Sequence, residues 1–171
     1  MTPYCRSLLD QTVATYLSRG VRNLEEVQAA LERRLAPLVL EQAGDGVILA
    51  IASLAEDRVI GEVSLWLRDV DPRTFEVGFA VLSDVQGRGY AREAVRALLT
   101  VTFDHLAAHE VIGIADRRNV ASASFMHRLG MRARPGAEET SQRVLFAIDG
   151  HGWQTEDHSG RVTTHTQGSK D

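Results

Sequence analysis

Two glycines lie where an apolar run gives way to a helical pattern, and such a junction can bind an anion. The segment EVGFAVLSDVQGRGYAREAVRALL, residues 76–99, predicts a strand, a short turn and an amphipathic helix in succession. Gly87 and Gly89 permit positive φ and close backbone approach, so successive N–H groups can converge at the positive end of the helix. The alternative is that both glycines only form a tight turn.

Two familiar phosphate-binding loops do not fit this junction. The sequence contains no G-x-x-x-x-G-K-S/T motif, and the stretch GRGYAR lacks the spacing G-x-G-x-x-G. We also expect the junction not to belong to a parallel strand–helix–strand unit with an acid about 20 residues further on.

A second polar pair lies at the start of another predicted helix. In IADRRNVASASFMHRLGM, residues 114–131, the chain leaves a strand and enters a helix through Asn119 and Ser122. Residues three apart lie on one side of the first turn, so these two side chains can act on the same ligand. The alternative is that Asn119 is an N-cap and Ser122 an ordinary residue of the first turn.

Composition and length narrow the class of protein. At 171 residues, with 44% hydrophobic and 25% charged residues, the chain suits one globular domain over 1–171, with a core over about 10–150 and an uncertain tail from 150. Its longest apolar runs are about half of the roughly 20 residues that a membrane-spanning helix needs, and no signal peptide is visible. We therefore expect a cytoplasmic protein that does not bind a membrane.

Charge and ligand spacing exclude two further classes of partner. The formal net charge is −4, whereas nucleic-acid-binding proteins usually carry a basic surface, so no nucleic-acid partner is expected. The histidines at 151, 158 and 165 recur every seven residues, a pattern that fits no recognised zinc spacing. We expect no metal.

The periodicity of the remaining chain predicts an α/β fold with a mixed, mostly antiparallel sheet. Alternating residues predict a three-strand antiparallel meander, followed by helices and shorter strands. In order, the expected elements are a helix over 23–38, strands over 46–55, 59–70 and 74–82, a helix over 90–108, a strand over 111–115, a helix over 119–130 and a strand over 143–148. Trp66, on the second strand of the meander, is expected to pack in the core.

Taken together, the glycine junction and the second polar pair resemble the acetyl-coenzyme A binding motifs of the GNAT superfamily of N-acetyltransferases. That family's loop pattern is Q/R-x-x-G-x-G/A, and its second motif is N-x-x-S followed by a helix that ends in L-G-F/M. The residues that match are Gln86, Gly89 and Ala91 in the first motif and Asn119 and Ser122 in the second. Within the superfamily, the stretch YAREAVRALL is most similar to the Rim-type ribosomal-protein N-terminal acetyltransferases. The resemblance covers about residues 10–150.

The resemblance implies a GNAT fold, with helices on both faces of the sheet, and a site for acetyl-coenzyme A. The strand before the loop would hold the pantetheine arm through its free backbone groups, where it splays from residues 112–115. The pyrophosphate would lie on the loop, and Asn119 would contact the arm. The residues that the resemblance assigns to the coenzyme are Phe79, Ala80, Val81, Leu82, Gln86, Gly87, Arg88, Gly89, Tyr90, Ala91, Asn119 and Ser122.

The implied reaction is direct attack of a primary amine, from a protein N-terminus or a small molecule, on the thioester. Ser122 occupies the position of the serine proposed as general acid in the Rim-type enzymes. The tyrosine acid of other family members is absent, since Phe125 and Met126 stand in its region. Glu76, on the strand that leads to the loop, is the candidate base. The alternative function is a catalytically silent acyl-coenzyme A binding or sensing module.

One departure from the family concerns the N-terminus. The sequence SLLDQTVATYLSRG already resembles the end of the family's first helix, so we expect the family's first strand to be missing. That strand would normally pair with the outer edge of residues 47–54. We therefore expect this edge to be covered by the chain's own ends or by a second copy in a homodimer.

Overall fold

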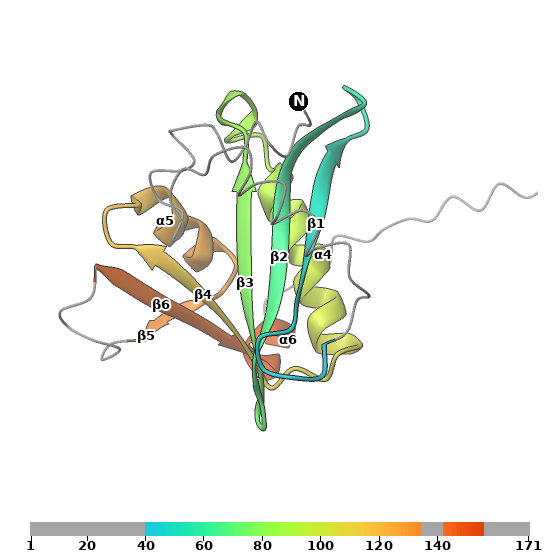
Figure 1. Cartoon of the computed structure of the whole chain (residues 1–171). Coiled ribbons are helices and arrows are strands. Elements are labelled where there is room, and N and C mark those ends of the chain that lie inside the picture. Colours follow the sequence, from blue (N-terminus) through green and yellow to red (C-terminus); the bar gives the residue numbers. More distant parts are fainter. Residues whose placement is uncertain (1–39, 135–141, 156–171) are drawn as a thin grey trace, which may run out of the picture.

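The computed structural model describes residues 40–134 and 142–155, and the helix expected over 23–38 lies outside them. Six strands form one sheet, in the order β1-β2-β3-β4-β6-β5. The first three form the antiparallel meander that the alternating residues predict (Figure 1): β1 (Gly46–Ser53), β2 (Arg58–Val70) and β3 (Arg73–Val81).

Helix α4 (Tyr90–Asp104) carries the chain from β3 to β4 (Glu110–Asp116), and this crossover makes the two strands parallel. A single 3-10 turn, η1 (Ser83–Val85), precedes it. The expectation that the glycine junction lies outside a parallel strand–helix–strand unit was wrong. The unit is present, although the glycine spacing differs from G-x-G-x-x-G.

The chain after β4 forms two more helices and the last two strands of the sheet. Its elements are α5 (Val120–Arg128), β5 (Arg132–Arg134), β6 (Arg143–Asp149) and α6 (Gly150–Thr155). The sequence did not predict β5, because three residues are too few to show an alternation. It did not predict α6 either, although the N–H of Gly152 donates to Oδ1 of Asp149 at 2.7 Å, the kind of cap that starts a helix.

Helix α4 ends four residues before the predicted end at 108. Its buried residues, Val95, Leu98, Leu99 and Thr102, follow the predicted helical period. Beyond the helix, Ala107 has a φ of 52°, a left-handed conformation that continues no helix. Leu106 nevertheless packs against the core, so the apolar period runs further than the helix.

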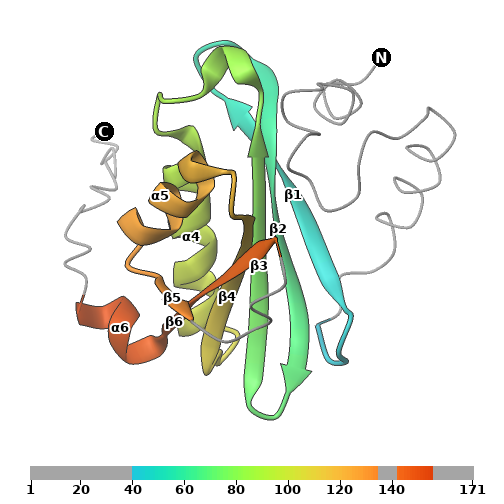
Figure 2. The ribbon, with the colours of Figure 1, turned by 90° about the vertical axis from the view of Figure 1, so that its left-hand side faces the viewer.

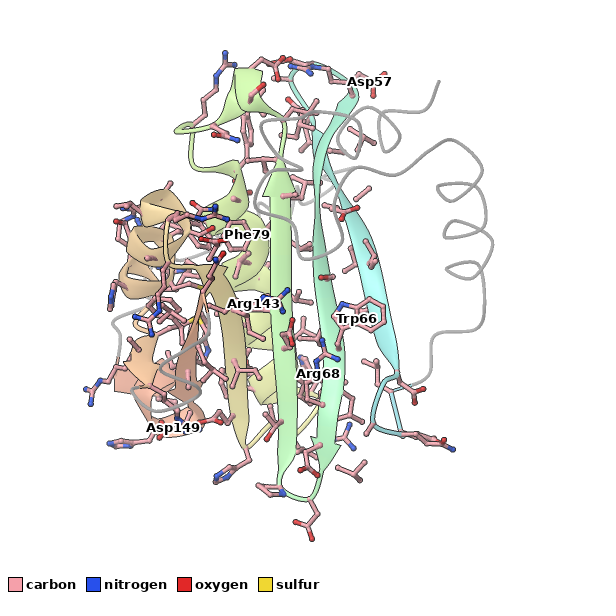
Figure 3. All side chains as sticks on the ribbon, turned by 60° about the vertical axis from the view of Figure 1, so that its left-hand side comes forward. Asp57, Trp66, Arg68, Phe79, Arg143 and Asp149 are labelled. Atoms are coloured by element: carbon pink, nitrogen blue, oxygen red, sulfur yellow. The ribbon has the colours of Figure 1, made fainter. Side chains whose placement is uncertain are left out.

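Helices α4 and α5 cover the same face of the sheet (Figure 2). The other face carries the alternate side chains of β2 and β3, among them Trp66 and Arg68 (Figure 3). Because successive residues of a strand point to opposite faces, burial of Leu65 and Leu67 under α4 turns Trp66 away from it. The expectation that Trp66 packs in the core was wrong: it is half-buried on the opposite face.

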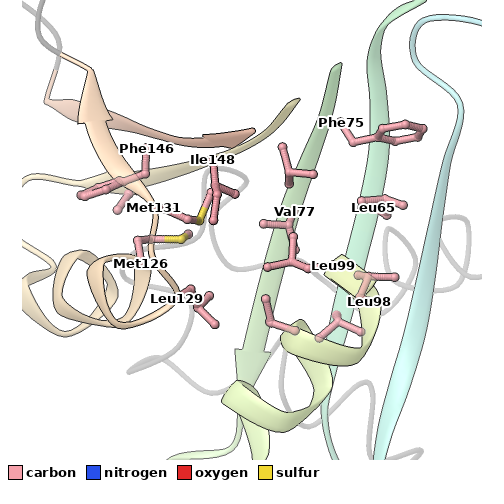
Figure 4. Packing of buried hydrophobic residues seen from close by; sticks show 14 of the residues in the cluster. Leu65, Phe75, Val77, Leu98, Leu99, Met126, Leu129, Met131, Phe146 and Ile148 are labelled. Carbon is pink, nitrogen blue, oxygen red and sulfur yellow. The ribbon is translucent and has the colours of Figure 1, made fainter. Parts of the chain in front are cut away.

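The core lies between the helical layer and the sheet (Figure 4). Phe75, Leu65 and Leu99 are at most 1% exposed, and burial of each such side chain is worth about 1.5–3 kcal/mol. Trp153 of α6 is 5% exposed and stacks on Phe103 of α4, with ring centroids 6.0 Å apart. This contact ties the last described helix to the crossover helix. Within the described ranges, no helix is both long and apolar enough to cross a membrane.

Candidate active site

The sheet opens between β3 and β4. These strands pair at only three positions, Thr74 with Glu110, Phe75 with Val111 and Glu76 with Ile112. Beyond Glu76, β3 keeps its partner β2, whereas β4 leans away from β3 together with β6 (Figure 1). The two strands therefore form a V whose vertex is the Glu76–Ile112 pair.

The ladder between β2 and β3 decides which backbone groups of β3 face the opening. The N–H of Leu82 donates to the carbonyl of Ile60 at 2.9 Å, so the backbone of Leu82 is turned toward β2. Alternation along an antiparallel ladder then turns the N–H and C=O groups of Val77, Phe79 and Val81 toward β4. Of these groups, the Val77 N–H is used in the last pair with β4 and the Val81 carbonyl accepts from Gln86, so the carbonyl of Val77, both groups of Phe79 and the N–H of Val81 are left for an extended ligand.

This geometry divides the residues predicted to hold a pantetheine arm. Phe79 and Val81 turn their backbone groups into the opening, whereas those of Ala80 turn toward β2. Leu82 has neither group free, since its carbonyl also accepts from the N–H of Val85 at 3.1 Å. For Leu82, the structure contradicts the expectation of free backbone groups. Sequence alone does not give the register of two strands. A shift of one residue would exchange the residues that face β2 with those that face β4.

The glycine loop lies at the wide end of the V, directly before α4. Gly87 and Gly89 have φ of 76° and 90°, a conformation that L-residues rarely adopt. The N–H groups of residues 87, 88 and 89 donate to no backbone carbonyl of the described residues, and the first N–H groups of α4 have no partner within the helix. Their convergence at the positive end of a helix suits a phosphate.

Two side chains of the loop are already engaged. Nε2 of Gln86 donates to the carbonyl of Val81 at 3.3 Å, which fixes the loop against the end of β3. The guanidinium of Arg88 donates to Oε1 of Glu56 at 3.4 Å, and its side chain is 56% exposed. The next two predicted coenzyme residues, Tyr90 and Ala91, begin α4 and are half-buried, and their N–H groups lie in the first turn of the helix.

Helix α5 begins at the end of β4. Oδ1 of Asn119 accepts the N–H of Ser122 at 3.0 Å, so Asn119 is the N-cap that the sequence offered as the alternative. No group in residues 40–134 and 142–155 accepts from the side-chain N–H groups of Asn119, which can therefore donate to a ligand. Phe125 packs on Phe79 of β3, with ring centroids 4.2 Å apart. This contact holds α5 across the opening from β3.

An acidic turn fixes the start of α5. Asp116 accepts both Nε and Nη2 of Arg118, at 2.9 and 2.7 Å, as well as the N–H of Arg118. These hydrogen bonds, first from the guanidinium and then from the backbone, lower the pKa of Asp116 to about 2. The carbonyl of Asp116 accepts the N–H of Asn119, so this turn orients the N-cap and with it Ser122.

Met126 fills the position nearest the vertex on the helical side. A Cβ added to Gly113 of β4 would lie 2.6 Å from Cε of Met126, so the end of the Met126 side chain lies directly against the strand at this glycine. Ser122 is one helical turn nearer the wide end, about 6 Å along the helix. The structure therefore brings Asn119 and Ser122 together over the middle of the opening, not over its vertex.

Glu76 approaches the vertex from the opposite face. It lies beside Trp66 on β2 and Ile112 on β4, and Oε2 accepts Nε of Arg68 at 2.8 Å. The Glu76 side chain is 20% exposed. The candidate acid and the candidate base thus flank the opening from its two sides, which suits a reaction in which one substrate lies in the V and the other arrives from the face away from α5.

Sequence reasoning missed three charged residues next to the glycine loop: Glu56, Arg58 and Asp84, which are linked by ion pairs. No spacing in the sequence could have revealed them, because the β1–β2 hairpin and η1 meet only in the folded sheet. In residues 40–134 and 142–155, no group of three or more His, Cys, Asp or Glu side chains could hold a metal ion. The predicted histidine tail lies largely outside these ranges.

The comparison with protein families decides the assignment. The family model described as "Acetyltransferase (GNAT) domain" matches residues 2–132. The chain belongs to the GNAT acetyltransferase family. The chain is also 27% identical over 124 residues to the uncharacterized N-acetyltransferase YnaD of Bacillus subtilis strain 168, a match that covers 72% of this chain and 68% of YnaD.

Solved GNAT structures share the fold. An acetyltransferase of the GNAT family from Bacillus anthracis superposes with a TM-score of 0.70 at 20% identity, over 85% of this chain and 86% of that one. The spermidine N-acetyltransferase of Vibrio cholerae, in complex with CoA and spermine, superposes with a TM-score of 0.71 at 14% identity, over 88% and 89% of the two chains. GNAT enzymes transfer an acetyl group from acetyl-CoA to an amine, so the predicted fold and reaction class are confirmed at this level.

Proposed function

We propose that this GNAT chain acetylates a primary amine by direct attack on acetyl-CoA bound in the V between β3 and β4. One observation carries the proposal: β3–β4 pairing stops at Glu76–Ile112, which opens a strand-shaped gap that runs from the glycine loop to a carboxylate. The pyrophosphate would lie on residues 86–91. The pantetheine arm would bond to the backbone of Val77, Phe79 and Val81.

The vertex of the V would determine the position of the thioester. An extended arm can replace β4 as a partner of β3 only where β4 itself is absent, and the strands rejoin at Glu76. The acetyl group at the end of the arm would therefore come to rest near the Glu76–Ile112 pair. This argument supports Glu76 as a group that touches the acceptor amine.

The proton transfers then follow from the two sides of the sheet. The neutral amine attacks the carbonyl carbon, the C–S bond breaks, and the amine loses one proton while the thiolate gains one. Glu76 would accept the first proton, directly or through water, and its ion pair with Arg68 would hold the carboxylate in place. Ser122, on α5 across the arm, would supply the second proton.

Among acceptors, we propose the α-amine of a protein N-terminus, the Rim-type substrate. An α-amine with a pKa of about 7.8 is roughly 14% neutral at pH 7, whereas a lysine amine at about 10.4 is roughly 0.04% neutral. An N-terminal amine therefore requires less of the base. Small-molecule amines, including polyamines, remain in the test because the reaction chemistry is the same.

The decisive experiment follows release of free CoA thiol from acetyl-CoA in the presence of a panel of amines. The panel contains short peptides with free N-termini, the same peptides with blocked N-termini, polyamines and an amine-free control. Thiol release that depends on a free N-terminus supports the proposal. CoA binding with no release for any amine supports the silent binding module instead, and absence of CoA binding contradicts both.

We further propose that the outer edge of β1 is covered in a homodimer. Among the described strands, β1 is the end of the sheet, and Leu49 is 46% exposed. An apolar strand edge tends to recruit another strand. A scattering mass of two chains, with slow amide exchange along residues 47–54, supports the dimer. A mass of one chain with rapid exchange there contradicts it.

A further inference from the structure

Four charged side chains join the tip of the β1–β2 hairpin to the glycine loop. Glu56 accepts Arg88 through Oε1 at 3.4 Å and Arg58 through Oε2 at 2.6 Å. Nη2 of Arg58 also reaches Oδ2 of Asp84, in η1, at 3.1 Å. We call Glu56, Arg58, Asp84 and Arg88 the hairpin network. It spans two segments that are distant in the sequence, the hairpin and residues 84–88, but lie at one end of the sheet (Figure 1).

Carboxylates outnumber cations around the loop by four to three, when Arg92 in the first turn of α4 is counted with Arg58 and Arg88. Glu56 and Asp84 are both negative, and Asp57 at the hairpin tip and Glu93 in the first turn of α4 add to them. Of the two cations in the network, only Arg88 belongs to the loop. Arg58 is the group that bonds both carboxylates, and its single positive charge offsets about half of their combined negative charge at the loop.

Arg58 also decides how strongly Arg88 is held. With Arg58 present, the Glu56 carboxylate is shared between two guanidinium groups, and its shorter contact is to Arg58. Without Arg58, the whole carboxylate charge would fall on Arg88 and compete with a phosphate for it. Both effects act in the same direction, since each would weaken the binding of an anion at the loop.

The geometry points to Arg58 as a positioning residue that makes the glycine loop receptive to the coenzyme phosphates without touching them. We propose this role on top of the proposed function, because it presumes that phosphates lie on residues 86–91. The ion pairs of the network are partly exposed, with the Arg58 side chain 33% exposed. Such pairs contribute little to stability, so their loss should leave the fold intact.

The test compares Arg58→Gln with the wild type by calorimetry with CoA at low salt. We expect the Kd to rise about 3- to 30-fold, the range for one unit charge within about 8 Å of a phosphate at the surface. Arg58→Lys, which keeps the charge, should stay within about twofold. The double variant Arg58→Gln with Asp84→Asn should recover most of the lost affinity, because it removes one of the carboxylates that Arg58 neutralises.

The matched control is Arg134→Gln. Arg134 also pairs with a glutamate, Glu110, and its loss changes the net charge by the same amount. Its partner Glu110 lies opposite Thr74 at the paired end of β3 and β4, about 20 Å or more from the loop along β3. This variant should bind CoA as the wild type does.

Two further measurements separate an electrostatic role from a structural one. The effect of Arg58→Gln should shrink at about 0.5 M salt, since screening reduces interactions between exposed charges. It should also be absent from turnover with S-acetylpantetheine, which has the thioester arm but lacks the pyrophosphate. A loss that persists in salt, or that is equal for both donors, shows that Arg58 acts through the fold and overturns the inference.

The failure of this inference is distinguishable from the failure of the proposed function. Wild-type protein that binds CoA while Arg58→Gln binds it equally well overturns the role of Arg58 alone. Wild-type protein that does not bind CoA overturns both.

Discussion

Replacement of Gly89 is the sharpest test of the loop, because Gly89→Asp and Gly89→Asn differ in charge and in almost nothing else. Gly89 is the N-cap of α4, with φ of 90° and ψ of −10°. A Cβ added at this position would meet no atom within 4 Å. Asn and Asp tolerate the left-handed region better than other side chains, so both replacements should fold, at a shared cost of about 1–2 kcal/mol.

The expected magnitude comes from Coulomb's law. A carboxylate at residue 89 would lie about 5 Å from two phosphate charges on the loop. At an effective dielectric constant of about 40–80, the repulsion is about 2–3 kcal/mol, or about 30- to 150-fold in Kd. Gly89→Asp should therefore bind CoA about 30- to 150-fold more weakly than Gly89→Asn, and the difference should fall as salt is added.

Calorimetric titration of both variants with CoA, at two ionic strengths and beside a thermal unfolding curve, measures these quantities. The comparison with Gly89→Asn removes the contribution of backbone strain and side-chain volume. If the two variants bind CoA with equal affinity, no phosphate lies at residue 89 and the assignment of the loop is wrong.

Three other changes test the rest of the site. Ser122→Ala should lower turnover by about 10² to 10⁴ with unchanged CoA affinity, whereas Ser124→Ala on the same helix should not; equal rates for both variants would reduce Ser122 to a helix residue. Glu76→Gln should lower kcat by a similar factor at neutral pH, and an unchanged rate would exclude it as the base. Arg118→Gln should raise the pKa of Asp116 from about 2 toward 3.8, as followed by NMR titration. Because the folded pKa is depressed, this carboxylate stabilises the wild type above pH 3.8 and loses that effect as the pH falls toward 2. The free energy of unfolding of the variant should therefore lack this contribution between pH 3.8 and 2. An unchanged Asp116 titration would contradict the pairing.

The sequence predicted the elements whose patterns are local. The meander of β1, β2 and β3 alternates strongly, and α5 has both a cap at Asn119 and a stop at Gly130, where φ is 82°. The two glycines likewise identified the loop, because positive φ is a local property. Elements without a local pattern were missed, such as the three-residue strand β5.

Features that depend on the register of two strands could not be predicted. The backbone groups of β3 that face β4 are those of Val77, Phe79 and Val81, and this choice depends on the bond between Leu82 and Ile60. The half-buried position of Trp66 on the face opposite α4 likewise follows from the phase of β2. The hairpin network joins residues that are distant in the chain, so its charges could be added up only in the folded protein.

On the proposed function, the short pairing of β3 with β4 would make the coenzyme part of the architecture of the sheet. Without a ligand, the halves β1-β2-β3 and β4-β6-β5 are joined as a ladder at only three residue pairs, and the rest of their union depends on the helices. On the proposed function, a bound arm fills the place of a strand, and its binding free energy adds to that of folding. At a concentration 100 times the Kd this amounts to about 2.7 kcal/mol. The cellular supply of acetyl-CoA would then govern how long the protein survives proteolysis, independently of how fast it turns over.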